Sequence, residues 1–415
     1  MASGLFLADR DQTSMELEDN GFFPISLASY KVNTAEKSVT SSIFGLMKRK
    51  AVFKEGLGGI LINDSFDPDK KFKVPHRDFF KNDATYPFGD KYQIDTIFSE
   101  VNYKQLESAV DRAFDHKGEK KQQTRSVVIV YKDKIIAEKY ADGFDQKSLM
   151  HGWSMTKSLT STIYGVLQRQ GKMNINEPAG IEAWQDDDRK QITISDLLHM
   201  NSGLEWEEEY FDISDVTKML YMESDMGMSQ VQKKLIGKPD SLWNYSSGTT
   251  NILSGPILRK HFGGHQEYLD FWYQELIDKI GMHSMVVETD LAGNYIGSSY
   301  AWATTRDWAK FGLLYLHEGN WNGNQVLDST WVRYTSTPTN TSEGRYGAQF
   351  WLNAGAYHPD VPLDMYSSNG FKGQHVFIIP SKDLVVVRTG LVSEPKFDVN
   401  DFLKHIIESI QKESL

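Results

Sequence analysis

The chain has 415 residues, 40% hydrophobic and 24% charged, which is long enough for a large core and more than one lobe. A formal net charge of -11 argues against a nucleic-acid-binding protein, because such proteins normally present a basic face. The chain contains no cysteine, which excludes disulfides, thiolate metal sites and a cysteine nucleophile.

The sequence predicts neither a membrane span nor a signal peptide. No apolar run reaches about 18 residues. Residues 1–10 lack the basic start and long apolar run of a secretory leader. The compartment stays open: cytoplasmic as the sequence stands, periplasmic or secreted if a leader has been removed.

The first 102 residues are expected to form an extension that packs on the main domain. Beta-rich runs at 39–46, 50–53 and 57–62 predict short strands there. Two further runs, 126–131 and 135–140, are joined by a short polar turn and predict a hairpin.

A helix is predicted to begin near Ser154, because apolar residues recur at helical spacing from Leu159 to Leu167. The segment 158–331 is expected to be mainly helical. Helices are predicted over 193–199, 215–222, 249–261, 268–280 and 305–317. Ser195 and Thr305 are expected to cap two of these helices.

The tail returns to strands, predicted over 346–353, 364–367, 374–379 and 384–389, followed by an amphipathic helix over 399–411. Strands at both ends of the chain with helices between them predict an α+β fold. The sheet domain would combine 103–157 with 332–415, and 158–331 would form an all-helical lobe.

The clearest candidate for a catalytic motif is Ser154-Met155-Thr156-Lys157. Residues three apart share a helix face, so Lys157 can reach the Ser154 hydroxyl. A serine needs a nearby base to act as a nucleophile, and an amine serves if its surroundings keep it neutral. A helix N-terminus also favours developing negative charge. The alternative is a capping serine followed by a solvated lysine.

Two other stretches add to this one. Tyr245 stands in a loop before a helix and can relay a proton; the alternative is a buried aromatic residue. Residues 369–375 form a glycine-flanked strand edge that can offer an amide to an oxyanion; the alternative is a hairpin turn. The acidic run 205–210 is interpreted as a solvated loop, with a cleft rim as the alternative. His261 and His265 lie four apart, but intervening glycines argue against a metal site.

In this order and spacing, the three stretches resemble the serine beta-lactamase and penicillin-binding-protein superfamily, which is marked by S-x-x-K, Tyr/Ser-x-Asn/Ser and K-T-G. The sequence is most similar to the esterase and amidase branch, which includes 6-aminohexanoate-dimer hydrolases. Supporting stretches are 196–204, 245–248, 299–307 and 346–351. The resemblance covers roughly residues 105 to 410.

The resemblance implies an antiparallel sheet flanked by helices (beta-lactamase/transpeptidase-like), with an all-helical lobe and no cofactor or metal. Ser154 would be the nucleophile of an acyl-enzyme and Lys157 its base. Tyr245 would shuttle the proton. The amides of Ser154 and Gln374 would form the oxyanion hole.

Two departures bear on the substrate. Ser247 stands where beta-lactamases usually have asparagine, and Phe371 stands at the K-T-G lysine position, with Lys372 expected on the opposite face of a strand. Without that charge, neutral or differently charged acyl groups are favoured over beta-lactams. Substrate contacts are expected from Ser247, Phe371, Gly373 and His375, although His375 has a structural role as its alternative.

The sequence therefore predicts a serine hydrolase for a small ester or amide, with neither a nucleic-acid partner nor a membrane span; a homodimer is left open. One alternative is a D-Ala-type carboxypeptidase or beta-lactamase. Another is a catalytically silent ligand-binding module.

Overall fold

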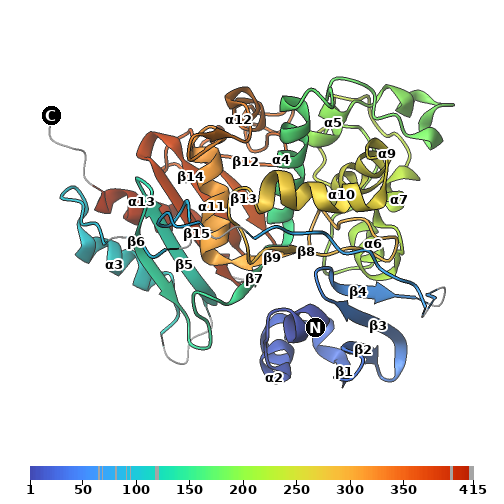
Figure 1. Cartoon of the computed structure of the whole chain (residues 1–415), viewed down its shortest axis with the longest axis horizontal. Helices are drawn as coiled ribbons and strands as arrows, with labels where there is room; N and C mark the ends of the chain where they lie inside the picture. Colours follow the sequence, from blue (N-terminus) through green and yellow to red (C-terminus); the bar gives the residue numbers. More distant parts are fainter. Residues whose placement is uncertain are drawn as a thin grey trace. The chain divides into compact units, whose positions relative to one another are not determined.

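The computed structural model describes residues 1–410 apart from 64–65, 68, 80–81, 90, 94, 117–120 and 393–395. The chain forms two compact units (Figure 1). The first comprises Met1–Arg77, Asn174–Tyr273 and Val286–Trp302, and the second comprises Asp78–Met173, Gln274–Met285 and Ala303–Leu415. Each unit is built from three separate segments of the chain. The sequence analysis instead placed domain boundaries at residues 102, 157 and 331. Those boundaries stay a prediction.

The second unit contains an antiparallel sheet in which the described strands follow the order β12-β13-β14-β15-β5-β6. The strands are β12 (Trp351–Leu352), β13 (Tyr366–Gly370), β14 (Gln374–Ile379), β15 (Leu384–Gly390), β5 (Thr124–Tyr131) and β6 (Lys134–Tyr140). Strand β15 pairs with β5, with Val387 opposite Val128, so two distant parts of the chain share one sheet. The antiparallel sheet and the 126–140 hairpin are thereby confirmed.

Helices cover both faces of this sheet (Figure 1). On one face, α3 (Tyr103–Arg112) and α13 (Val399–Ser409) share a core with side chains of the strands. On the other face lies α11 (Thr305–Leu316), where a Cβ on Gly312 would come within 2.7 Å of Val385. Burial on both faces explains why β15 is buried along its whole length.

The second unit also contains the helix that the sequence predicted after Ser154. A 3-10 turn, Trp153–Met155, leads directly into α4 (Thr156–Arg169), which is buried over most of its length. The described part of this unit also contains β7 (Leu149–His151), β10 (Asn320–Trp321), β11 (Asn324–Gln325) and α12 (Ser329–Thr335).

The first unit begins with an antiparallel sheet of order β1-β2-β3-β4. The strands are β1 (Ala28–Asn33), β2 (Ser38–Ile43), β3 (Leu46–Lys54) and β4 (Gly58–Ile62), after the short helices α1 (Ala2–Phe6) and α2 (Gln12–Ser14). The predicted run 50–53 lies within β3 and 57–62 matches β4 to within a residue, whereas 39–46 spans β2, the turn at Phe44 and Gly45, and the first residue of β3. Leu57 and Ile60 are buried with Leu291 in a small core of this unit.

The rest of the first unit is mainly helical, as predicted. It contains α5 (Ile194–Leu198), α6 (Asp215–Met222), α7 (Met226–Val231), α8 (Ser247–Ile252), α9 (Leu258–His261) and α10 (His265–Trp272), and the strand β8 (Val286–Val287), which pairs with the start of β9 (Ala301–Thr304). Residues Leu253–Ile257 continue α8 into α9 as a π-helical turn. Within the described residues, no helix is long and apolar enough to cross a bilayer.

Three local predictions were wrong. The cap of α5 is Thr193 rather than Ser195, because Thr193 is still extended and its side chain accepts from the Asp196 amide in a capping box. Thr304, not Thr305, caps α11, because Thr304 is still extended and its side chain accepts from the Asp307 amide. The strand expected over 346–353 forms only at β12, since Gln349 has a φ of 65° that breaks the extended path.

Candidate active site

Ser154 and Lys157 meet as their spacing predicts. The Lys157 Nζ donates to the Ser154 Oγ over 3.0 Å. Ser154 is 8% exposed and Lys157 only 1% exposed. Burial disfavours a charged ammonium, so this setting suits an amine that takes up the serine proton.

The turn of residues 152–155, called the nucleophile turn after the predicted role of Ser154, is held in a strained conformation. Trp153 has a φ of 48°, which is uncommon for a bulky residue and is often found at functional positions. Its ring lies 4.3 Å from His151 and 5.5 Å from Phe371, measured between centroids. A Cβ on Gly152 would fall 2.3 Å from the Trp308 ring, so only glycine fits there.

The last residues of β13, beyond its pairing with β12, contact this turn. The Ser368 Oγ donates to the Met155 carbonyl over 3.1 Å. A Cβ on Gly370 would lie 2.1 Å from the Gly152 carbonyl oxygen, so the two backbones are in direct contact. Among the described strands, β12 pairs with β13 only at Tyr366 and Ser367. The end of β13 therefore borders the nucleophile turn.

Helix α4 is anchored by one of the stretches that carried the family resemblance. The Ser158 Oγ donates to the Gln349 carbonyl over 2.7 Å, and the Ser161 Oγ donates to the Ala348 carbonyl over 3.0 Å. These bonds lie on the turns of α4 that follow Lys157. They explain a polar face on a buried helix and fix the axis along which Ser154 and Lys157 are placed.

Gln374 lies in the inner strand β14, which pairs with β13 on one side and β15 on the other. Its side chain is engaged with Gly390: Nε2 donates to the carbonyl over 2.5 Å, and Oε1 accepts from the amide over 3.1 Å. The side chain is thus structural. The predicted role of the Gln374 amide in an oxyanion hole stays a prediction.

The other three predicted contacts in this hairpin differ in position. Phe371 lies beside Trp153 and so beside the nucleophile turn. Gly373 has a φ of 81°, and its carbonyl accepts from the buried Arg388 over 2.6 Å. The His375 Nδ1 bonds to the Asn369 Oδ1 over 2.9 Å, and burial together with the nearby Arg388 lowers its pKa to about 3. His375 is therefore a neutral, structurally engaged histidine.

The prediction that Lys372 points away from Phe371 across a strand was wrong. Lys372 lies in the turn with a φ of 60°, and its Nζ lies 5.8 Å from the centroid of the Phe371 ring. Alternation between faces applies only to extended backbone, and this turn is not extended.

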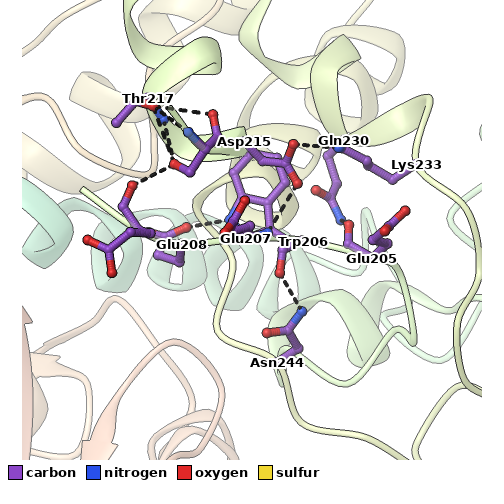
Figure 2. A network of polar contacts seen from close by, with 11 residues as sticks. Glu205, Trp206, Glu207, Glu208, Asp215, Thr217, Gln230, Lys233 and Asn244 are labelled. Carbon is purple, nitrogen blue, oxygen red and sulfur yellow. Dashed lines mark hydrogen bonds and ion pairs between the residues drawn. The ribbon is translucent and has the colours of Figure 1, made fainter. Parts of the chain in front are cut away.

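Tyr245 belongs to the first unit, in the segment that leads into α8. The Ser246 Oγ caps that helix by accepting from the Thr249 amide over 3.0 Å, which confirms a loop followed by a helix. The Asn244 amide donates to the Met200 carbonyl over 2.8 Å, within the 196–204 stretch. The Asn244 Nδ2 donates to the Trp206 carbonyl over 3.2 Å (Figure 2). Tyr245 itself is half-buried.

Ser247 also lies in the first unit, and its polar groups are bound by a residue that the sequence analysis did not single out. Its amide donates to the Glu208 Oε2 over 2.8 Å, and its hydroxyl donates to the Glu208 Oε1. The acidic run is therefore only partly solvated. An alternating pattern in the sequence could have identified Glu208. An extended segment places alternate residues on one side, so Glu208 shares a side with the aromatic residues Trp206 and Tyr210, while the three other glutamates of the run are exposed.

Among the described residues, no group of three or more His, Asp or Glu side chains is arranged to hold a metal ion. Ser154 and Lys157 lie in the second unit and Tyr245 in the first, and the joint action of the three stays a prediction.

Comparison with known proteins matches a Beta-lactamase family model over residues 110–401. A candidate 6-aminohexanoate-dimer hydrolase from Bacillus anthracis is 21% identical with a TM-score of 0.59, covering 75% of this chain and 83% of that one. A family VIII carboxylesterase is 14% identical with a TM-score of 0.59, covering 76% and 98%. A penicillin-binding-protein homologue from Caulobacter crescentus is 12% identical with a TM-score of 0.57, covering 76% and 99%.

At these identities the solved structures establish the fold: helices and an antiparallel sheet of the beta-lactamase/transpeptidase type. The family match extends over most of the chain and includes Ser154, Lys157, Tyr245 and the hairpin around Gly370. The chain belongs to the Beta-lactamase family, within the beta-lactamase-like serine hydrolase superfamily.

Proposed function

We propose that this protein hydrolyses a small ester or amide through an acyl-enzyme on Ser154. The observation that supports this most directly is the buried hydrogen bond of 3.0 Å from the Lys157 Nζ to the Ser154 Oγ. Both side chains are buried, and the turn before them contains Trp153 with a positive φ of 48°. Such a pair is suited to proton removal from the hydroxyl.

In the proposed reaction, Lys157 takes the Ser154 proton as the Oγ attacks the substrate carbonyl. The Ser154 amide and a second amide from the hairpin Gly370–Gln374 stabilise the oxyanion. The family resemblance implies that this second amide is that of Gln374. The contact of Gly370 with the nucleophile turn favours the next residue, Phe371, as a second candidate. Tyr245 passes the proton to the leaving group, and water then releases the acid.

A neutral acyl group is the proposed substrate type. Phe371, rather than a lysine, lies against Trp153 beside the nucleophile, which offers aromatic surface to an uncharged group. Because esters and simple amides need no cationic contact for recognition, they fit this arrangement better than substrates identified by a carboxylate.

The position of Lys372 supports a second candidate function. Lys372 places its Nζ 5.8 Å from the Phe371 ring, so a cation is present in the same turn. A D-Ala-type carboxypeptidase or beta-lactamase would use such a charge to bind a carboxylate. Rapid nitrocefin turnover, or slow trapping by labelled penicillin, would favour that candidate over a short-chain esterase.

The test is a panel of p-nitrophenyl esters, linear amides, D-amino-acid peptides and nitrocefin on wild-type protein and Ser154→Ala. Ser99→Ala is the control, since it removes an exposed serine hydroxyl of the same unit that takes no part in placing Ser154 or Lys157. We expect the control to retain ester cleavage and fluorophosphonate labelling, and Ser154→Ala to lose both. Retention of both by Ser154→Ala would refute the assignment.

A further inference from the structure

Glu208 is saturated with hydrogen bonds from the neighbourhood of Tyr245. Its Oε1 accepts from the Ser247 hydroxyl and from the Tyr210 hydroxyl, the latter over 2.7 Å. Its Oε2 accepts from the Ser247 amide over 2.8 Å and from the Trp206 indole over 2.5 Å. A carboxylate offers about four acceptor positions, so these four donors engage the whole group.

The segment that carries Glu208 is itself braced (Figure 2). The Glu207 amide donates to Asp215 over 3.1 Å, and Asp215 pairs with Lys233 over 2.6 Å. The Glu205 carbonyl accepts from Gln230 over 3.4 Å. Trp206 is 7% exposed. Glu208 thus projects from a fixed backbone, and its bonds to Ser247 do not have to order a mobile loop.

The residues on both sides of Tyr245 are fastened to this segment. Before it, Asn244 donates to the Trp206 carbonyl over 3.2 Å. After it, Ser247 donates twice to Glu208. A Cβ on Gly248 would fall 2.6 Å from the Trp206 ring, so the chain packs directly against that side chain. The backbone around Tyr245 is therefore held at several points by residues 206–208.

We propose that Glu208 is a positioning residue, which holds Tyr245 in place for proton transfer through its hydrogen bonds to Ser247. This inference rests on the proposed function, in which Tyr245 moves the proton. It assigns Ser247 a supporting role in place of the substrate contact that its motif position predicted. The carboxylate is suited to this task because each of its oxygens takes one donor from Ser247 and one from an aromatic side chain.

The experiment combines Glu208→Ala and Glu208→Gln with wild-type and Tyr245→Phe backgrounds, and measures kcat and KM on a p-nitrophenyl ester. Glu207→Ala is the matched control, because Glu207 is an exposed neighbour. Misplacement by about 1 Å lowers rates about 100-fold. We expect Glu208→Ala to lower kcat by about 30–100-fold with KM changed less than about 3-fold. The control should be unchanged.

Two further results separate positioning from general stability. Glu208→Gln should stay within about 5-fold of wild type, because its amide can accept the Ser247 amide bond and donate to a hydroxyl. In the Tyr245→Phe background, Glu208→Ala should lower kcat by less than about 2-fold more, since residues that act through one another are not additive. If Glu208→Ala does not fold, Tyr210→Phe, which removes one donor, should lower kcat by about 2–5-fold.

The proposal is overturned if Glu208→Ala keeps wild-type kcat, or if it lowers kcat equally in both backgrounds. It is also overturned if fluorophosphonate titration shows that the loss reflects fewer competent sites rather than slower turnover per site. Full activity of Tyr245→Phe alone would instead refute the role of Tyr245 in the proposed function, a result that is distinguishable because it does not involve Glu208.

Discussion

Replacing Gly370 with alanine tests how closely β13 must approach the nucleophile turn. The added Cβ would lie 2.1 Å from the Gly152 carbonyl oxygen. Carbon–oxygen contacts between backbones are ordinarily about 3.3 Å, so strand and turn must separate by about 1.2 Å. Gly370 does not have a positive φ, so alanine itself imposes no backbone strain at this position.

This displacement sets the expected effect. Misplacing reacting groups by about 1 Å lowers rates about 100-fold, which corresponds to about 2.7 kcal/mol of transition-state stabilisation. Overpacking at a tight contact destabilises folding by about 1–3 kcal/mol. Gly370→Ala should therefore lower kcat/KM about 100-fold while leaving a folded protein with a lower melting temperature.

The assay is ester hydrolysis together with the rate of fluorophosphonate labelling and a thermal melt. Gly264→Ala is the control, because its Cβ would meet nothing within 4 Å. Wild-type kcat/KM in Gly370→Ala would refute the reasoning, since the β13 edge would then not need its contact with the turn.

Three further predictions concern a base, a buried cation and two buried carboxyls. Lys157→Met should lower kcat/KM by about 100- to 10,000-fold without lowering the melting temperature, because it removes the base but fills its space; an active variant would contradict the role of Lys157. Arg388→Met should lower the free energy of unfolding by about 3 kcal/mol in urea titrations, because the Gly373 and Gln122 carbonyls lose their donors; unchanged stability would contradict this. Burial raises the pKa of Glu288 to about 7, and burial with the nearby Asp225 raises that of Asp290 to about 7. Because unfolded carboxyls titrate near about 4, the folded state binds more protons between about pH 4 and 7, and the free energy of unfolding falls as pH rises through that window. Glu288→Gln should be more stable than wild type at pH ~8 but not at pH ~4; equal pH dependence in urea titrations would contradict it.

The parts of the site that were predictable from sequence are those fixed by local spacing. Ser154 and Lys157 are one helical turn apart, so helix geometry alone brings the amine to the hydroxyl. The strand Gln374–Ile379 and the helix Asp215–Met222 have the predicted bounds, because apolar periodicity and short polar turns define them.

The parts that were missed depend on distant partners. Glu208 stands in an acidic run, and its bonds to Ser247 span 39 residues, which no local pattern reveals. The contact of Gly370 with Gly152 joins two segments that are far apart in sequence. The 346–353 run had the composition of a strand, but Gln349 has a φ of 65°, and the carbonyls of Ala348 and Gln349 accept bonds from Ser161 and Ser158, which lie far away in the sequence.

The most direct test of the central claim is mass spectrometry of the protein quenched during turnover of a p-nitrophenyl butyrate substrate. If Ser154 forms the acyl-enzyme, the protein gains the mass of one butyryl group, located on the peptide that contains Ser154 and absent from Ser154→Ala. An adduct on another residue, or continued turnover by Ser154→Ala, would contradict the central claim.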